Sequence, residues 1–469
     1  MNHQPEFFKQ IQQAGQGHIL RFWNELPEPA RERLLNQIRT IDFTLLARLI
    51  EEHLKSLESA VAHKKLEPTG VITLPETTSA KKRRAEARQA GEAALRQGKV
   101  ACLLVAGGQA SRLGYDGPKG AFKVGPISGK SLFQLFGERI LALNRIYHTQ
   151  IPWYIMTSET NDGQTRDFFA QNRFFGLPED MVGFFKQMMM PAVDFNGRLI
   201  LSDKGNIFMN PAGNGVCPLA LKKSGALEAM QEEEIEHVFY FQVDNALANI
   251  ADPVFIGYHI LDQTEVSTKV VAKLYPEEKM GVVGQINGRF GIIEYSELSE
   301  EQMYARKDNG SLRFGYGTIG IYVFSREFLE KVAEGFNLPF HAARKAIPCL
   351  DESGGLIQPT APNGIKFETF IFDMLPQAGK ASAIEVVREE EYLPLKNKEG
   401  ENSPTTVTRG LINLYALWLE AAEIKVPRDD QGEVAGVVEI SPIFALDRES
   451  FVEKVDKNIT FDGRLYIEG

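Results

Sequence analysis

The sequence is poor in cysteine and histidine. Its 469 residues hold three cysteines, Cys102, Cys217 and Cys349, which lie far apart and show no metal-ligand spacing. This pattern excludes a disulfide framework and predicts a reducing compartment. The eight histidines form no HxxxH or HExxH pair, so we do not expect a zinc site.

Long apolar runs and an excess of positive charge are also missing. No stretch is apolar over the length of a membrane span, and the first residues, MNHQPEFFKQIQQAG, lack the apolar core of a secretory leader. The formal net charge of −10 argues against a general nucleic-acid binder. We therefore expect a cytoplasmic monomer or weak homo-oligomer, with neither a membrane nor a nucleic acid as partner.

The length suits two or three domains, and the hydrophobic content of 43% is ordinary for a globular protein. Residues 1–95 are predicted to form a helical N-terminal region, because apolar residues recur there at helical spacing. Residues 65–80 are an expected linker or extended strap, and a helix is predicted to follow to about Gln97. Residues 96–385 are predicted to form a central α/β domain, and residues 386–469 a C-terminal region with a helix and a small β-rich domain.

The most informative stretch begins with the apolar run Val100–Val105, which is typical of a buried parallel strand. A glycine-rich loop follows at once and carries two cations, Arg112 and Lys119. Glycines let backbone N–H groups approach a phosphate closely, and the cations would neutralise its charge. The plainer alternative, a surface turn before a helix, does not explain two cations placed among so many glycines.

Three familiar phosphate motifs do not fit this stretch. Gly107 and Gly108 are adjacent, so the G-x-G-x-x-G fingerprint fails. The segment from Gly125 to Ser131 nearly matches a Walker A loop, but Val124 stands where its first glycine belongs. No lysine, HRD and DFG set of a kinase is found. The pattern L-x-x-G-G-x-x-x-R-L-G-x-x-x-P-K, which starts at Leu104, instead resembles the signature of nucleotide-sugar pyrophosphorylases.

Further strands and helices alternate along the central region, which predicts an α/β fold with a parallel sheet covered by helices on both faces. The expected strands are 151–157 and 238–243, and the expected helices are 132–147, 164–172 and 218–233. Ligands of such sheets bind beyond the carboxyl ends of the strands. The loop after Val105 and the residues after Val243 should therefore share one edge. From Thr264 to Tyr295 we expect antiparallel strands, with a hairpin turn at Asn287-Gly288.

Other candidate site residues have plain structural alternatives. Asp244 follows an apolar strand and could hold Mg²⁺ against nucleotide phosphates, or it could cap a turn. The Gly213-Asn214 turn could contact a flat base, or it could be an ordinary tight turn. Gln187 could bond a uracil edge, or it could lie in a loop after a packed strand.

The chain resembles the UDP-N-acetylhexosamine pyrophosphorylases of the eukaryotic-type UDP-sugar pyrophosphorylase family. Beyond the signature loop, the resemblance runs in order from about residue 90 to 425. It rests on the segments FFKQMMMPAV, NPAGNG, VDNALANIADPVFIGY, GVVGQINGRFGIIEYSEL, IKFETFIFDML and EYLPLKNKEGENSPTT. It implies a helical N-terminal part, a Rossmann-like, GT-A-like nucleotide-diphospho-sugar transferase domain with a central mixed sheet, and a small C-terminal β domain.

The resemblance also implies a role for individual residues. The implied UTP and uridine contacts are Leu104, Ala106, Gly107, Gly108, Gln187, Gly213, Asn214 and Lys366. The implied sugar contacts are Glu294, Tyr295, Thr318 and Asn214. The implied catalytic cations are Arg112, Lys119 and Lys396, with Asp244 on Mg²⁺. One departure bears on the sugar, because N-acetylhexosamine enzymes carry Gly-Asn-Ile where this chain has Gly317-Thr318-Ile319.

These residues predict a uridylyltransferase that joins UTP to a sugar 1-phosphate and releases pyrophosphate. N-acetylglucosamine 1-phosphate is the favoured acceptor, and glucose or galactose 1-phosphate is the alternative. The acceptor is already largely a dianion near neutral pH, since the second pKa of a phosphate monoester is about 6, so it needs no general base. A non-catalytic UDP-sugar-binding regulator is the alternative from another class. It could have lost Arg112, Lys119 and Asp244, and this chain retains all three.

We predict that Gln187→Ala weakens the preference for UTP over CTP by roughly tenfold or more in kcat/KM. A carboxamide can donate to a uracil carbonyl and accept from N3–H, whereas cytosine presents the opposite pattern at these atoms. Measuring both nucleotides with one sugar phosphate, together with the melting temperature, tests this. Unchanged discrimination would leave base reading to the backbone.

Overall fold

The computed structural model describes residues 4–55 and 64–469. The chain divides into two compact units, each assembled from segments that are distant in the sequence. The first unit combines Met1–Lys64, Gln187–Cys217 and Asn337–Asp373, and the second combines Lys65–Lys186, Pro218–Phe336 and Met374–Gly469. The expected division at residues 95/96 and 385/386 remains a prediction about which segments fold independently.

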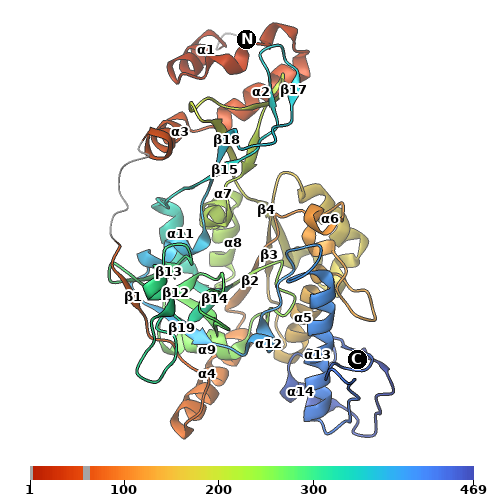
Figure 1. The fold of residues 1–469 in the computed structure, drawn as a ribbon. Helices are drawn as coiled ribbons and strands as arrows, with labels where there is room; N and C mark the ends of the chain where they lie inside the picture. The colour runs from red at the N-terminus through yellow and green to blue at the C-terminus, as the bar shows by residue number, and fades with distance from the viewer. Residues whose placement is uncertain (1–3, 56–63) are drawn as a thin grey trace. The chain divides into compact units, whose positions relative to one another are not determined.

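The second unit is built on a mixed sheet to which ten strands of the described chain contribute (Figure 1). Its main path runs through β1 (Leu66–Pro68), β12 (Val282–Ile286), β14 (Tyr316–Ser325), β10 (His237–Gln242), β2 (Val100–Val105), β3 (Trp153–Thr157) and β4 (Val182–Lys186). Strands β10, β2, β3 and β4 are parallel to one another, β14 runs antiparallel to β10, and β12 in turn pairs antiparallel with β14. Off this path, β11 (Val266–Ala272) pairs with β14 and with β19 (Ala381–Glu385), and β13 (Arg289–Ile293) pairs with β12. The α/β class with a central mixed sheet is confirmed.

Helices cover both faces of this sheet, because alternate residues of its central strands face opposite sides. Cys102 and Leu104 of β2 share one core with α4 (Thr78–Arg96), α5 (Leu132–Tyr147) and α9 (Pro253–Leu261). On the other face, Phe324 of β14 stacks on Phe328 of α11 (Arg326–Glu334). Further helices of the unit are α6 (Asp162–Gln171), α8 (Ala226–Glu232), α10 (Glu300–Tyr304) and α12 (Arg388–Glu391). Helix α7 (Cys217–Ser224) begins at the last residue that belongs to the first unit.

The parallel register brings two loops to one edge of the sheet. Val105 pairs with Gln242 of β10 and with Met156 of β3, so the three strands end side by side. The loop after Val105 and the residues after Val243 therefore lie at the same edge, as the sequence pattern predicts.

Three local expectations can be compared with the structure. The Asn287-Gly288 hairpin is confirmed, since β12 and β13 pair up to Ile286 and Arg289. Residues 65–80, expected to be a linker or an extended segment, contain β1, which hydrogen-bonds to β12. The single helix expected over 218–233 is wrong. Gly225 adopts a φ of +79° and splits it into α7 and α8, because this left-handed conformation interrupts a right-handed helix.

The C-terminal residues join the same core. Helix α13 (Pro404–Ala421) begins after Ser403, whose side chain accepts from Thr406 N, as the Ser-Pro pattern predicts. The tail is less β-rich than expected. It holds one parallel pair, β20 (Val437–Ile440) with β21 (Arg464–Ile467), and helix α14 (Arg448–Lys454).

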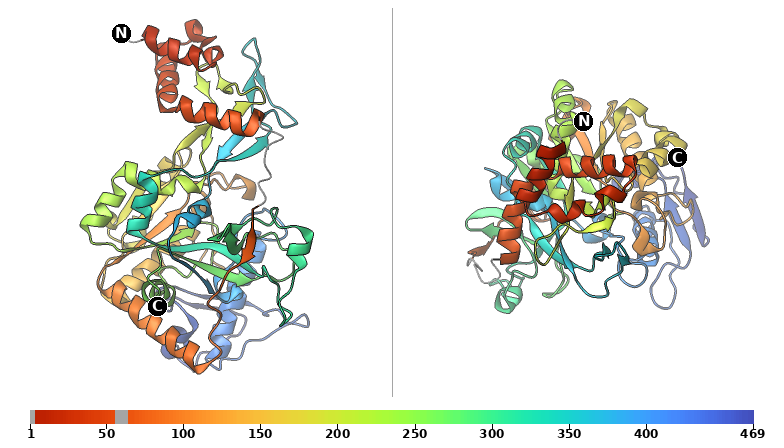
Figure 2. Two further views of the ribbon diagram at one scale, coloured as in Figure 1. Left: turned by 90° about the vertical axis from the view of Figure 1, so that its left-hand side faces the viewer. Right: turned by 90° about the horizontal axis from the view of Figure 1, so that it is seen from above.

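The first unit packs N-terminal helices against two later segments (Figure 2). Its helices are α1 (Gln4–Gln13), α2 (Glu28–Thr40) and α3 (Phe43–Ile50). The helical expectation for residues 56–60 lies outside the described residues. The strands are β5 (Met189–Pro191), β6 (Val193–Asp194), β7 (Leu201–Asp203), β8 (Asn206–Ile207), β9 (Met209–Pro211), β15 (His341–Lys345), β16 (Cys349–Leu350), β17 (Leu356–Ile357) and β18 (Gly364–Glu368). Gln16 fixes the contact, because its amide donates to Gly197 O at 2.9 Å and accepts from Leu199 N at 2.8 Å.

No helix in the described part of the chain has the length and apolar character needed to cross a bilayer.

Helices α4 and α9 meet at two glycines with almost no space between their backbones. A Cβ built on Gly91 would lie 1.9 Å from Pro253 O, and one on Gly257 would lie 1.6 Å from Ala87 O. Such separations are far shorter than any non-bonded contact, so both positions require glycine for this crossing.

We predict that Gly257→Ala lowers the free energy of unfolding by about 3 kcal/mol or more, because the helices must separate to admit the methyl group. Gly163→Ala is the control, since a Cβ at that position of α6 meets nothing within 4 Å. It should stabilise the fold by about 0.5–1 kcal/mol. Thermal and denaturant unfolding measure both, and an unaffected Gly257→Ala would contradict the crossing.

Candidate functional site

The glycine-rich loop after β2 folds back on itself. Ala110 N donates to Gly117 O at 3.0 Å, and Lys119 N donates to Gly108 O at 3.1 Å. Leu104 and Ala106 are buried at its base, and a Cβ added to Gly108 would meet nothing within 4 Å. Packing within the chain therefore does not require glycine at 108, which leaves space above this backbone for a ligand.

Asn161, which follows β3, hydrogen-bonds to the backbone of the loop. Its side-chain amide donates to Ala106 O at 2.8 Å and to Gly108 O at 3.3 Å, and its Oδ1 accepts from Ser158 N at 2.8 Å. Asn161 is fully buried. Sequence reasoning missed this residue, since a lone asparagine after a strand carries no distinctive signal.

Four charged groups of the second unit lie in one electrostatic neighbourhood. Burial lowers the pKa of Lys119, and the positive charges of Lys396 and Arg112 lower it further, whereas the carboxylate of Asp244 opposes them. Lys119 Nζ also donates to Leu395 O at 3.3 Å. The structure thus brings together the three predicted cations and the predicted metal ligand.

Lys396 reaches this neighbourhood at the end of a segment, residues 388–396, that we call the strap. Leu395 N donates to Asp244 O at 2.8 Å, and Ala246 N donates to Leu393 O at 3.1 Å. The buried side chain of Asn245 donates to Glu391 O and accepts from Leu393 N. The strap therefore extends along the residues that follow β10, and Asn245 is a second residue that sequence reasoning left without a role.

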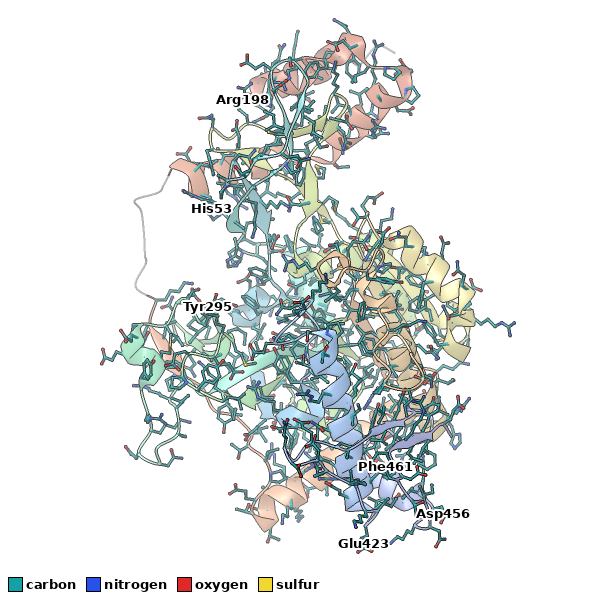
Figure 3. The ribbon with its side chains drawn as sticks, turned by 45° about the vertical axis from the view of Figure 1, so that its right-hand side comes forward. His53, Arg198, Tyr295, Glu423, Asp456 and Phe461 are labelled. Atoms are coloured by element: carbon teal, nitrogen blue, oxygen red, sulfur yellow. The ribbon has the colours of Figure 1, made fainter. Side chains whose placement is uncertain are left out.

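Two of the predicted sugar contacts of the second unit flank Gly281. Glu294 Oε1 lies 3.3 Å from the position of a Cβ on Gly281, and Thr318 N donates to Gly281 O at 2.9 Å. The Thr318 hydroxyl lies 3.3 Å from the hydroxyls of Thr268 and Tyr322. Tyr295 follows Glu294 and is 40% exposed (Figure 3).

The remaining predicted contacts belong to the first unit. Gly213 adopts a φ of +86°, and a Cβ there would lie 2.1 Å from Thr369 O. Asn214 Oδ1 accepts from Ile371 N at 2.8 Å, and Ala212 N donates to Met188 O, which places this turn beside buried Gln187. Lys366 lies in β18, where its Nζ is 4.9 Å from the centre of the Phe208 ring and burial lowers its pKa.

The near-Walker segment is occupied by a carboxylate of the chain itself. Ile127 N and Ser128 N donate to Glu439 Oε2 at 2.6 and 2.7 Å, and Ser128 Oγ donates to the other carboxylate oxygen. Glu439 is buried in β20. An acidic side chain thus takes the place that a phosphate would take in a true Walker loop, in agreement with the sequence interpretation.

Comparison with known proteins identifies the relatives. The profile of the UTP–glucose-1-phosphate uridylyltransferase family matches residues 46–451. The chain is 38% identical to the human UDP-N-acetylhexosamine pyrophosphorylase-like protein 1, with 94% of this chain and 92% of that protein covered. It is 35% identical to the UDP-N-acetylglucosamine pyrophosphorylase of Saccharomyces cerevisiae, with 87% and 90% covered. The chain belongs to the UTP–glucose-1-phosphate uridylyltransferase family.

A solved structure agrees with this assignment. The UDP-N-acetylglucosamine pyrophosphorylase of Trypanosoma brucei superposes with a TM-score of 0.84 at 28% identity, over 100% of this chain and 99% of that one. Membership of the uridylyltransferase family makes the protein a nucleotidyltransferase that transfers uridylyl from UTP to a sugar 1-phosphate.

The donor set of this uridylyltransferase fits a cation that is held mainly by its substrate. No group of three histidine, cysteine or acidic side chains forms a metal site within residues 4–55 and 64–469. Asp244 supplies one carboxylate at the edge of the sheet, beside Lys119. Mg²⁺ commonly takes one or two protein carboxylates and completes its shell with phosphate oxygens and water.

We predict that Asn161→Asp destabilises the glycine-rich loop after β2. Aspartate keeps the acceptor oxygen for Ser158 but loses both N–H donors, which leaves two carbonyls opposite a buried negative charge. The free energy of unfolding should fall by about 3 kcal/mol, and KM for UTP should rise roughly tenfold.

Thr160→Ala is the matched control, because it removes only a neighbouring hydroxyl that contacts Ser158. Calorimetry and initial rates measure both variants. A parent-like Asn161→Asp would show that the loop holds its shape without the asparagine.

Proposed function

We propose that this uridylyltransferase condenses UTP with N-acetylglucosamine 1-phosphate and releases pyrophosphate, with Mg²⁺ as its metal. Pyrophosphorylases of this kind generally use a divalent metal. The grouping of Arg112, Lys396 and Asp244 around Lys119 carries the proposal. A site for joining two phosphate-bearing substrates needs such a concentration of positive charge, because anion repulsion is its main obstacle.

The proposed mechanism is an in-line displacement. A phosphate oxygen of the sugar 1-phosphate attacks the α-phosphorus of UTP, and the bond to the pyrophosphate leaving group breaks. Arg112 and Lys119 would hold the triphosphate, and Lys396 would hold the sugar phosphate, so that the attacking and leaving oxygens are aligned. Mg²⁺ held by Asp244 would supply further charge neutralisation. No residue has to remove a proton from the acceptor.

The proposed uridine contacts are the backbone from Leu104 to Gly108, the Gln187 carboxamide and the turn at Gly213-Asn214. Lys366 is proposed as a further contact to the phosphates. A carboxamide and a backbone that approaches closely suit a single-ring base with alternating donors and acceptors.

The proposed sugar contacts are Glu294, Tyr295, Thr318 and Asn214. The names of the human and yeast relatives support an N-acetylated sugar for this chain. Thr318 supports the second candidate, glucose or galactose 1-phosphate. Its hydroxyl already lies near the hydroxyls of Thr268 and Tyr322, and it is shorter than the asparagine expected from the resemblance. A cytoplasmic location and a monomeric or weakly oligomeric state are also proposed.

Pyrophosphate release from UTP, measured with Mg²⁺ and each of four acceptors, tests the proposal. The acceptors are the 1-phosphates of N-acetylglucosamine, N-acetylgalactosamine, glucose and galactose. We expect the highest kcat/KM with the first and no turnover without Mg²⁺. Arg112→Ala should lower kcat by roughly a hundredfold, on the order of 3 kcal/mol, because it removes a charge aimed at the triphosphate.

Arg145→Ala, an exposed arginine of α5, is the control for loss of one positive charge and should turn over like the parent. A glucose preference would establish the second candidate. Release of no pyrophosphate with any acceptor, despite binding of UDP-sugars, would make the protein a non-catalytic binder.

A further inference from the structure

A lysine that no substrate contact explains lies buried behind the strap. Lys269 of β11 has an exposed fraction of 0%, and its Nζ contacts Asp252 Oδ2 at 2.8 Å and Glu391 Oε2 at 2.5 Å. Asp252 is the N-cap of α9, where it also accepts from Val254 N. Glu391 is the last residue of α12, within the strap.

Stability alone is a weak reason for this arrangement. Removing three charges from water costs free energy, and buried ion pairs often stabilise a fold no better than apolar residues of the same size. What such a group fixes is geometry, because moving one partner leaves a charge buried and unpaired. The two ion pairs of Lys269 therefore matter chiefly for the atoms whose positions they fix.

A series of hydrogen bonds connects Glu391 to the proposed site. Its carbonyl accepts from the Asn245 side chain at 2.8 Å, and that side chain also accepts from Leu393 N at 2.9 Å. Two residues further on, Leu395 N bonds Asp244 O, and Leu395 O accepts from Lys119 Nζ. Every step from Lys269 to the cations is thus a hydrogen bond or a covalent link.

Arg388, the first residue of α12, is also held in place by an ion pair and a hydrogen bond. Arg388 pairs with Glu278 at 3.0 Å and donates to Ala272 O at 3.0 Å. Glu278 lies three residues before Gly281, which Glu294 and Thr318 flank. The strap is therefore fixed beside the proposed sugar contacts at one end and beside Asp244 at the other.

We infer that Lys269 is a positioning residue for uridylyl transfer: its ion pair with Glu391 fixes the strap so that Lys396 and the Leu395 carbonyl stand opposite Asp244 and Lys119. The inference rests on the proposed function for its catalytic meaning. The mechanical part, the hold of Lys269 on the strap, does not depend on it.

The protonation state of Glu391 changes with pH, which allows this positioning role to be tested. Burial raises the pKa of Glu391 to about 7, although Lys269 opposes the rise. The other charged groups near it are Asp252, which raises its pKa further, and Arg139 of α5, which lowers it. Burial also acts to raise the pKa of Asp252, but Lys269, the Val254 N–H and Arg84 together hold that pKa below its usual value. Asp252 therefore stays charged at pH values where Glu391 gains a proton.

The experiment compares Glu391→Gln with the parent from pH 6 to pH 8.5. At pH 6 most parent molecules carry a protonated Glu391, which resembles glutamine, so the two kcat/KM values should be within about twofold. At pH 8.5 the parent has the ion pair and the variant does not, and the variant should be about tenfold slower. A ratio that stays constant across this range would overturn the inference, because a packing role alone does not titrate.

Lys269→Met adds a second measurement, with Lys130→Met as the matched control. Lys130 is a buried lysine whose Nζ pairs with Glu138 at 2.7 Å and donates to Ser441 Oγ, and neither partner belongs to the strap. We expect Lys269→Met to lower kcat/KM thirtyfold or more, and Lys130→Met to change it less than threefold. Equal losses in the two variants would reduce Lys269 to an ordinary buried ion pair.

Hydrogen exchange separates this inference from the proposed function. The amides of Leu393 and Leu395 should exchange at least tenfold faster in Glu391→Gln than in the parent at pH 8.5, whatever reaction the protein catalyses. Unchanged exchange would refute the hold on the strap. A parent that releases no pyrophosphate would refute the function and leave this structural result standing. If Lys269→Met does not fold, the pH ratio and the exchange rates of Glu391→Gln still decide the matter.

Discussion

The in-register parallel pairing of β2 with β10 is the constraint on which the second unit's site depends. Because Val105 stands opposite Gln242, the glycine-rich loop and Asp244 emerge at the same level of the same edge. A shift of one residue would turn every side chain of the strand to the other face. The aromatic and aliphatic residues on both faces of these strands therefore secure the position of the loop as well as the core.

The charges around this edge are held close to one another by hydrogen bonds of the backbone. Lys119, Lys396 and Arg112 repel each other, and only Asp244 opposes them within this group. Hydrogen bonds from the strap to the residues after β10 therefore hold a cluster that repulsion alone would spread. Such a cluster is prepared for an anionic ligand, because the cost of bringing the cations together is met during folding rather than during binding.

Some elements of the fold and of the candidate site could be predicted from the sequence, and others could not. The apolar run predicts β2 with the observed ends, and Asn-Gly and Ser-Pro predict a hairpin and a helix start, because these signals are local. The two cations of the glycine-rich loop, Arg112 and Lys119, could also be singled out in advance, since their spacing is distinctive. Asn161 and Lys269 could not, because their roles depend on partners 53 to 122 residues away. The break at Gly225 was equally hidden, since an isolated glycine is often tolerated in a helix.

Glu439 has a consequence for the order in which the chain can fold. Its carboxylate accepts hydrogen bonds from the N–H groups of Ile127 and Ser128, 311 residues or more earlier, in the segment that follows the glycine-rich loop. During synthesis the N–H groups of Ile127 and Ser128 cannot bond this carboxylate until residue 439 has left the ribosome. Most strands of the central sheet precede residue 439 and can pair earlier, but the hydrogen bonds of Ile127 and Ser128 to Glu439 form only after that residue has been made.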